Sequence, residues 1–118
     1  MTVHQRGVTL LELMITVVIV AIVATLAISG YNGYVATARE AVLGQNIDTM
    51  RVFQEDFRLR TGAYSGEDWA PGDGETETGW LPQQDGRNVS YVVTVAGNQY
   101  TVVATDGDTG TIITRTFP

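Results

Sequence analysis

The chain has 118 residues and a formal net charge of −6, with thirteen Asp and Glu residues against seven Arg and no Lys. This length allows one small domain, and the acidic balance argues against direct binding of nucleic acid. The absence of Cys excludes disulfides, a thiol nucleophile and a Cys-based metal site. The only His is His4, and the acids cluster in flexible, Gly-rich segments, so we expect neither an enzyme nor a bound cofactor.

An apolar stretch at residues 8–28 is long enough to cross a membrane as a helix, and Glu12 is its only charged residue. His4 and Arg6 precede it, which predicts a cytoplasmic N-terminus and an extracytoplasmic remainder. One alternative is a secretory signal peptide cut near Ile28 or Gly30, although the stretch is long for one and contains a carboxylate. A second alternative is a plain membrane anchor whose Glu12 reaches the interface.

The order Arg6-Gly7-Val8, with Glu12 five places after Gly7, resembles the type IV prepilin leader and its processing site. The resemblance implies that residues 1–7 are a leader, which prepilin peptidase removes by cutting between Gly7 and Val8. It also implies N-methylation of the new Val8 amine. In assembly, Glu12 would meet the Val8 amine of a neighbouring subunit and set the axial register. Val8 stands where the family usually has Phe.

The helix is expected to run from about Val8 to about Arg60, with residues 8–30 as its membrane-spanning and polymerising half and residues 31–61 as its amphipathic half. Tyr31 and Tyr34 follow the apolar run, as interfacial aromatic residues often do. The stripe that predicts a core in the second half comprises Val35, Ala38, Val42, Leu43, Ile47, Met50, Phe53 and Phe57.

Three poor helix formers, Ser29, Gly30 and Gly33, lie where many pilins carry a helix-bending Pro. They predict flexibility of the helix at this point, without showing whether it bends, melts or stays straight. Gly62 is suited to the residue after a helix C-terminus. A Gly-x-Tyr phrase of this kind, here ending at Tyr64, commonly closes the first helix of pilin-like proteins.

Residues 62–88 are rich in Gly, Pro and acidic residues, and this composition predicts a loop. We interpret its acids as a solvated face. Trp69 and Trp80 are expected to pack on the helix rather than to form a platform for a sugar or another ligand. Loops of this kind link helix to sheet in pilins, where they tend to face neighbours or solvent.

The last part, residues 89–118, contains three runs rich in Val, Ile, Thr and Tyr. These runs predict antiparallel strands at 89–96, 99–105 and 111–117. Gly97-Asn98 suits a tight hairpin between the first two. The expected fold class is therefore α+β, in which the C-terminal half of a long N-terminal helix packs on a small sheet of about three strands, as in pilins.

Asp106 and Asp108 lie in a Gly-rich loop and resemble half of a calcium site. Major secretion pseudopilins bind calcium near their strands. No further acid follows at the required spacing, so we predict no metal site and keep the pair as a weak candidate.

The sequence therefore predicts a structural subunit of a type IV pilus, with adhesion, motility or uptake as outputs. It would enter the inner membrane as a precursor and polymerise into an extracellular filament. The implied partners are further copies of the chain, other pilins, prepilin peptidase and an inner-membrane assembly platform. One alternative is a pseudopilin of a type II secretion or competence system. Another is a monomeric, membrane-anchored binding module that recognises an external ligand through Trp69 and Trp80.

Overall fold

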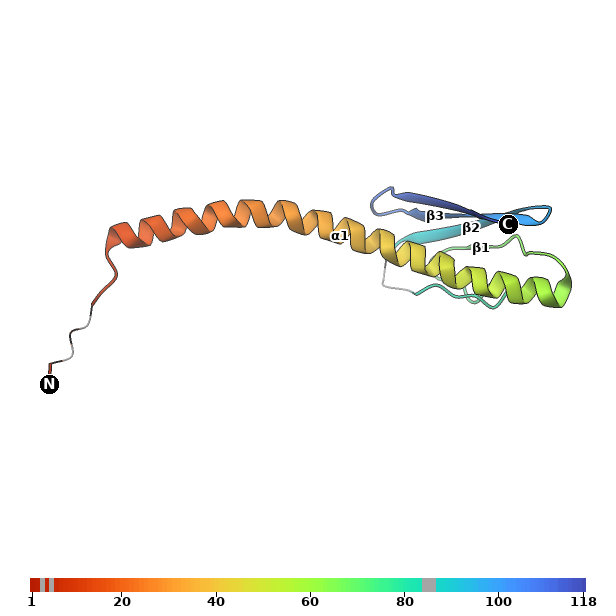
Figure 1. The fold of residues 1–118 in the computed structure, drawn as a ribbon, viewed down its shortest axis with the longest axis horizontal. Helices are drawn as coiled ribbons and strands as arrows, with labels where there is room; N and C mark the ends of the chain where they lie inside the picture. The colour runs from red at the N-terminus through yellow and green to blue at the C-terminus, as the bar shows by residue number, and fades with distance from the viewer. Residues whose placement is uncertain (3, 5, 84–86) are drawn as a thin grey trace. The chain divides into compact units, whose positions relative to one another are not determined.

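The computed structural model describes residues 1, 2, 4, 6–83 and 87–118. Residues 3 and 5 of the predicted leader and residues 84–86 of the predicted loop lie outside the described residues. The chain divides into two compact units, Met1–Thr37 and Ala38–Pro118, and each is described by itself. One helix, α1 (Leu10–Thr61), contributes residues to both (Figure 1).

In the first unit, α1 begins at Leu10, two residues after the approximate start that the sequence predicted. Thr9 is the N-cap of the helix: its hydroxyl accepts a hydrogen bond from the backbone N–H of Glu12 at 3.2 Å. A residue in this N-cap position has non-helical backbone angles. Val8 therefore precedes the helix.

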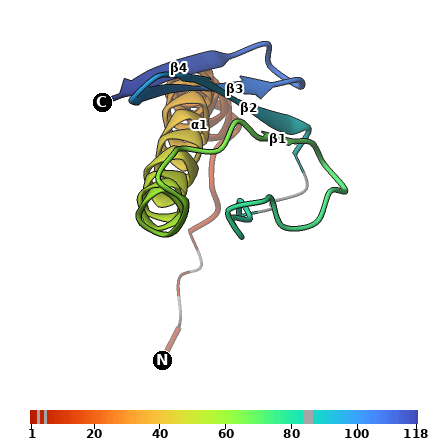
Figure 2. The same ribbon diagram turned by 90° about the vertical axis from the view of Figure 1, so that its right-hand side faces the viewer.

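The second unit holds a four-stranded antiparallel sheet in the order β1-β2-β3-β4 (Figure 2). Three strands, β2 (Val89–Ala96), β3 (Gln99–Asp106) and β4 (Ile112–Phe117), match the predicted ones within one residue. The fourth, β1 (Asp68–Trp69), lies inside the segment predicted to be a loop and pairs with Val92 and Tyr91 of β2. The predicted α+β, pilin-like class is confirmed, and the predicted strand number was one too low.

Two glycines adopt the backbone conformations that the sequence predicted. Gly97 has a φ of 63° and opens the two-residue turn between β2 and β3, which suits a tight hairpin. Gly62 has a φ of 89°, and its N–H donates to the carbonyl of Arg58 at 2.7 Å. This geometry ends α1 with the left-handed residue that follows many helices.

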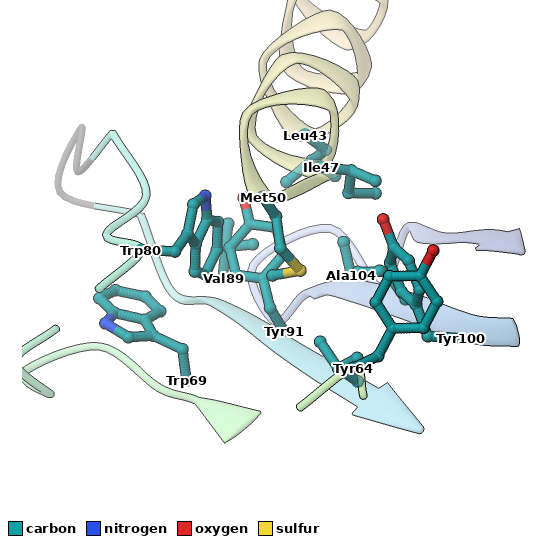
Figure 3. Packing of buried hydrophobic residues seen from close by; sticks show 12 residues of the cluster. Leu43, Ile47, Met50, Tyr64, Trp69, Trp80, Val89, Tyr91, Tyr100 and Ala104 are labelled. Atoms are coloured by element: carbon teal, nitrogen blue, oxygen red, sulfur yellow. The ribbon is translucent and has the colours of Figure 1, made fainter. Parts of the chain in front are cut away.

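The core of the second unit lies between the sheet and the C-terminal part of α1 (Figure 3). Of the predicted stripe, Leu43, Ile47 and Met50 are buried, and Phe53 packs against the same cluster. Val35, Val42 and Phe57 are partly buried, and Ala38 is the exposed member of the predicted stripe. The sheet residues that face the core are Val89, Tyr91, Val93, Tyr100, Val102 and Ala104.

Trp69 and Trp80 are buried in this cluster, with exposed fractions of 5% and 0%. The indole of Trp80 meets the ring of Tyr91 edge-on, with 5.1 Å between ring centroids. Both indoles are buried in the cluster that also contains Leu43, Ile47 and Met50 of α1, which agrees with the predicted packing role and not with the alternative of a binding platform. Neither ring is free to form an exposed binding platform.

The interpretation of the loop acids as a solvated face was wrong for Glu67, which is buried. Its carboxylate accepts hydrogen bonds from the backbone N–H of Thr78 at 3.2 Å and from the Thr78 hydroxyl at 2.9 Å. The side-chain amide of Gln54 approaches it to 3.5 Å. These donors compensate for the water that the carboxylate loses on burial, which composition alone could not reveal.

Candidate processing and assembly site

The N-terminus of α1 is closed by a reciprocal pair of hydrogen bonds between Thr9 and Glu12. The backbone N–H of Thr9 donates to Glu12 Oε2 at 2.9 Å, while the backbone N–H of Glu12 donates to Thr9 Oγ1 at 3.2 Å. This is a capping box, in which each side chain satisfies a backbone donor that the helix leaves unpaired. Glu12 also places a negative charge at the positive end of the helix dipole. Both features stabilise a helix that starts at Leu10.

Gly7 and Val8 lie just before this cap in non-helical backbone. Val8 is 76% exposed, and a Cβ added to Gly7 would meet nothing within 4 Å. The peptide bond between the two residues is therefore accessible and is not held in helical hydrogen bonding. Such a bond can enter the active site of a peptidase without local unfolding of α1.

The helical surface that follows is apolar and unburied. By length and composition, α1 could cross a membrane, and none of the residues in its apolar window is buried within the chain. The hydroxyls of Thr16 and Thr25 donate to the backbone carbonyls of Glu12 and Ala21 at 2.7 Å, which satisfies them without any outside partner. Glu12 is thus the single charged group on a surface otherwise suited to hydrocarbon or to another apolar helix.

A comparison with protein families matches residues 3–28 to the prokaryotic N-terminal methylation motif. The chain carries a type IV prepilin-like signal motif. No curated protein and no solved structure matches the chain. The prepilin-like motif and the apolar helix support a pilin or pseudopilin-like substrate of prepilin peptidase that is methylated and anchored as a membrane precursor. Such a motif points to a structural protein rather than to an enzyme.

The match covers the predicted cleavage residues Gly7 and Val8 and the predicted assembly residue Glu12. The structure brings Glu12 into contact with Thr9, for which no role was predicted from the sequence. The T-x-x-E spacing of Thr9 and Glu12 is itself a sequence signature of a capping box and could have revealed this pair.

Ser29, Gly30 and Gly33 all lie within α1 and are helical. A Cβ added to either glycine would meet nothing within 4 Å, so no close packing within the chain requires glycine there. One turn later, the hydroxyl of Thr37 donates to the Gly33 carbonyl at 3.0 Å. Back-bonding of this kind often accompanies helix bending.

Asp106 and Asp108, the weak metal candidates, serve the loop between β3 and β4. Asp106 is fully buried, and its Oδ1 accepts from the backbone N–H groups of Asp108 at 3.0 Å and Thr109 at 3.3 Å. Its Oδ2 lies 3.8 Å from Arg87 Nη1. Asp108 Oδ2 accepts from the backbone N–H of Asn88 at 3.2 Å. Among the described residues, no three His, Asp or Glu side chains gather into a possible metal site.

Proposed function

We propose that the chain is a subunit of a type IV pilus, cut between Gly7 and Val8, methylated at Val8 and polymerised through the apolar part of α1. The observation that carries this proposal is one carboxylate, Glu12, at the start of a long apolar helical surface with nothing packed on it. The type IV prepilin-like motif spans the same residues. An apolar helix of this kind is held by lipid before assembly and by other helices afterwards.

The energetic role of Glu12 follows from its position. A carboxylate within hydrocarbon costs several kcal/mol unless it is paired or protonated. Cleavage after Gly7 would create a cation on Val8, and the Val8 amine of a neighbouring subunit could pair with Glu12 where water is excluded. Register errors would leave both charges unpaired, so the pair selects one axial offset between subunits.

The second unit would be the part exposed on the filament surface. It has its own core and sheet, and because the chain contains no Cys, packing holds its C-terminal strand without a disulfide. The precursor would reside in the inner membrane with this unit outside, and an assembly platform there would add it to a filament of like subunits and other pilins.

We further propose that Ser29, Gly30 and Gly33 let α1 adjust when lipid is exchanged for neighbouring helices. Glycine lowers helix stability by about 1 kcal/mol relative to Ala. The variant Gly30→Ala/Gly33→Ala should keep cleavage and membrane insertion but reduce filament yield. An unchanged yield would remove this role.

A pseudopilin of a secretion or competence system uses the same motif and remains the second candidate. The two differ in where the polymer goes: pilus subunits reach the cell surface in quantity, while pseudopilins at native levels stay near the envelope. A monomeric binding module based on Trp69 and Trp80 has less support, because both indoles are buried.

The test compares wild type with Glu12→Gln and Glu12→Ala in native cells, measuring the chain in sheared surface filaments and in membranes. We expect abundant wild-type chain in the sheared fraction and retention of both variants in the membrane. Asp56→Asn is a matched control, since Asp56 is an exposed acid of α1 whose partner is Arg60, four residues later in the same helix. Wild-type chain confined to the envelope would favour the pseudopilin, and assembly independent of Glu12 would contradict the proposed mechanism.

A further inference from the structure

The hydroxyl of Thr9 competes with any extension of α1 towards the N-terminus. An α-helix grows in that direction when a backbone N–H donates to the carbonyl four residues earlier. For α1, such a bond would run from the Glu12 N–H to the Val8 carbonyl. That N–H instead donates to Thr9 Oγ1 at 3.2 Å. The donor needed to add Val8 to the helix is therefore already used.

The other bonds at the start of α1 hold the same boundary. The Thr9 N–H donates to Glu12 Oε2 at 2.9 Å, and the Leu13 N–H donates to the Thr9 carbonyl at 3.1 Å as the first bond of the helix. A residue bonded in this way keeps the non-helical backbone of an N-cap. All of these bonds lie within residues 9–13. Removal of residues 1–7 would leave them intact, so precursor and mature chain would share one helix start.

Further growth of α1 would involve the bond that is proposed to be cut. The Leu11 N–H would then donate to the carbonyl of Gly7, which belongs to that bond. Peptide hydrolysis adds a nucleophile to this carbonyl, and its oxygen has to meet the donors of the enzyme as charge develops on it. In the structure, Gly7 and Val8 are non-helical, and Val8 is 76% exposed. The capped helix stops short of the Gly7 carbonyl.

We propose that Thr9 is a positioning residue for the cleavage: as the N-cap, it holds the helix start at Leu10 and keeps the Gly7–Val8 bond in the non-helical form that prepilin peptidase takes up. The inference rests on the proposed function and adds a residue to its processing site. The matched motif, residues 3–28, contains both the cap and the bond. Without the cap, α1 would start at several residues, and cleavage would slow with the fraction that starts correctly.

The test measures cleavage of full-length chains in micelles by prepilin peptidase from the same cells. Wild type and one variant are mixed in each reaction, and the intact masses of the two products give the ratio of their kcat/KM values. Thr9→Val keeps the shape of the side chain but removes the hydroxyl. It should be cut about fivefold more slowly, the factor that corresponds to loss of a typical N-cap.

The matched control is Thr25→Val, the same substitution in the same helix. The Thr25 hydroxyl donates to the Ala21 carbonyl at 2.7 Å and has no part in the helix start. This variant should be cut at the wild-type rate.

Two further variants separate capping from direct recognition of Thr9 by the peptidase. Ser and Asn are both good N-caps, although Asn has neither a hydroxyl nor the shape of Thr. Thr9→Ser and Thr9→Asn should therefore be cut within about twofold of the wild-type rate. Protection of the Glu12 amide from hydrogen exchange should follow the same order, with Thr9→Val the least protected.

Wild-type cleavage of Thr9→Val would overturn the inference, because the cap would then have no effect on processing. Slow cleavage of Thr9→Asn with a protected Glu12 amide would also overturn it, because the peptidase would then read the Thr9 side chain itself. Both results leave the pilus function standing, since wild type is still cut after Gly7. If wild type is not cut between Gly7 and Val8, the proposed function falls, and this inference falls with it.

Discussion

Gln54 of α1 binds the backbone of Ser65 through both atoms of its side-chain amide. Gln54 Nε2 donates to the Ser65 carbonyl at 2.8 Å, and the Ser65 N–H donates to Gln54 Oε1 at 2.9 Å. Gln54 is fully buried, so these bonds replace those that the loop backbone would make with water. The pair fixes the chain as it leaves α1 and turns towards β1.

Replacement of Gln54 by Leu should destabilise the second unit by about 3 kcal/mol, because two buried backbone groups of Ser65 lose their partners. Chemical denaturation of the full chain in detergent measures this change in the free energy of unfolding. Gln45→Leu, at an exposed position of the same helix, should change stability by less than about 0.5 kcal/mol. Equal effects of the two substitutions would show that the Gln54–Ser65 pair contributes nothing specific.

The ring of Phe117 holds the C-terminal strand against both β3 and α1. The ring of Phe117 stacks on Tyr100 with 5.1 Å between centroids, and the guanidinium of Arg51 lies 5.4 Å from its centre. The Tyr64 hydroxyl, whose closer acceptor is Glu55 Oε1 at 2.8 Å, also lies 3.1 Å from the Pro118 carbonyl oxygen. Phe117→Ala should lower the free energy of unfolding of the second unit by about 2 kcal/mol. It should also make β4 more susceptible to proteolysis. Thr114→Ala, at an exposed position of β4, is the control; similar proteolysis of both would argue against the aromatic anchor.

Tyr100 should make the fold sensitive to alkali. Burial raises the pKa of its hydroxyl above the ordinary value of 10.0, and the charge of Glu55 raises it further. Above about pH 10 the unfolded chain releases this proton while the folded chain retains it, so the free energy of unfolding falls as pH rises. Above about pH 10, the free energy of unfolding of Tyr100→Phe should therefore fall by about 1.4 kcal/mol less per pH unit than that of wild type.

At neutral pH, Tyr100→Phe should be as stable as wild type or up to about 1 kcal/mol more stable, because the buried hydroxyl has no hydrogen-bond partner among the described residues. Tyr34→Phe, at an exposed tyrosine, is the control and should leave the alkaline slope unchanged. An alkaline slope unaffected by Tyr100→Phe would disprove the role of this hydroxyl.

The capping box predicts a specific effect at the start of α1. Thr9→Val removes the hydroxyl that accepts the Glu12 N–H and should weaken the first turn by about 1 kcal/mol. Hydrogen exchange of the full chain in micelles should then be about fivefold faster at the Glu12 amide, with no change beyond Val20. Thr9→Ser keeps the acceptor and should exchange at the wild-type rate.

Local patterns predicted most of this fold. The apolar run, the three long strands, the Gly97 turn and the Gly62 helix end depend on neighbours in the sequence, and the structure contains each of them. The prepilin-like motif predicted Gly7, Val8 and Glu12 in the same way, since its residues are contiguous. The cleavage, methylation and assembly roles of these residues remain predictions.

Features that depend on distant partners escaped sequence reasoning. The strand β1 has two residues, too few for an alternating pattern, and forms only because β2 lies beside it. Asn46 and Gln54 lie on the buried face of α1 although they are polar, since backbone groups of residues 83 and 65 are their partners. Glu67 is buried for the same reason, because its donor Thr78 comes eleven residues later.

The central claim is that the mature chain starts at Val8 and assembles through that end. The most direct test is intact-mass and N-terminal peptide analysis of the protein from native cells. The mature chain would have one amine, at its N-terminus, because the sequence contains no Lys, so its methylation can be read without interference. The account predicts a chain that lacks the first seven residues and begins with N-methylated Val8. A chain that begins at Met1, or near Ile28 or Gly30, would contradict it.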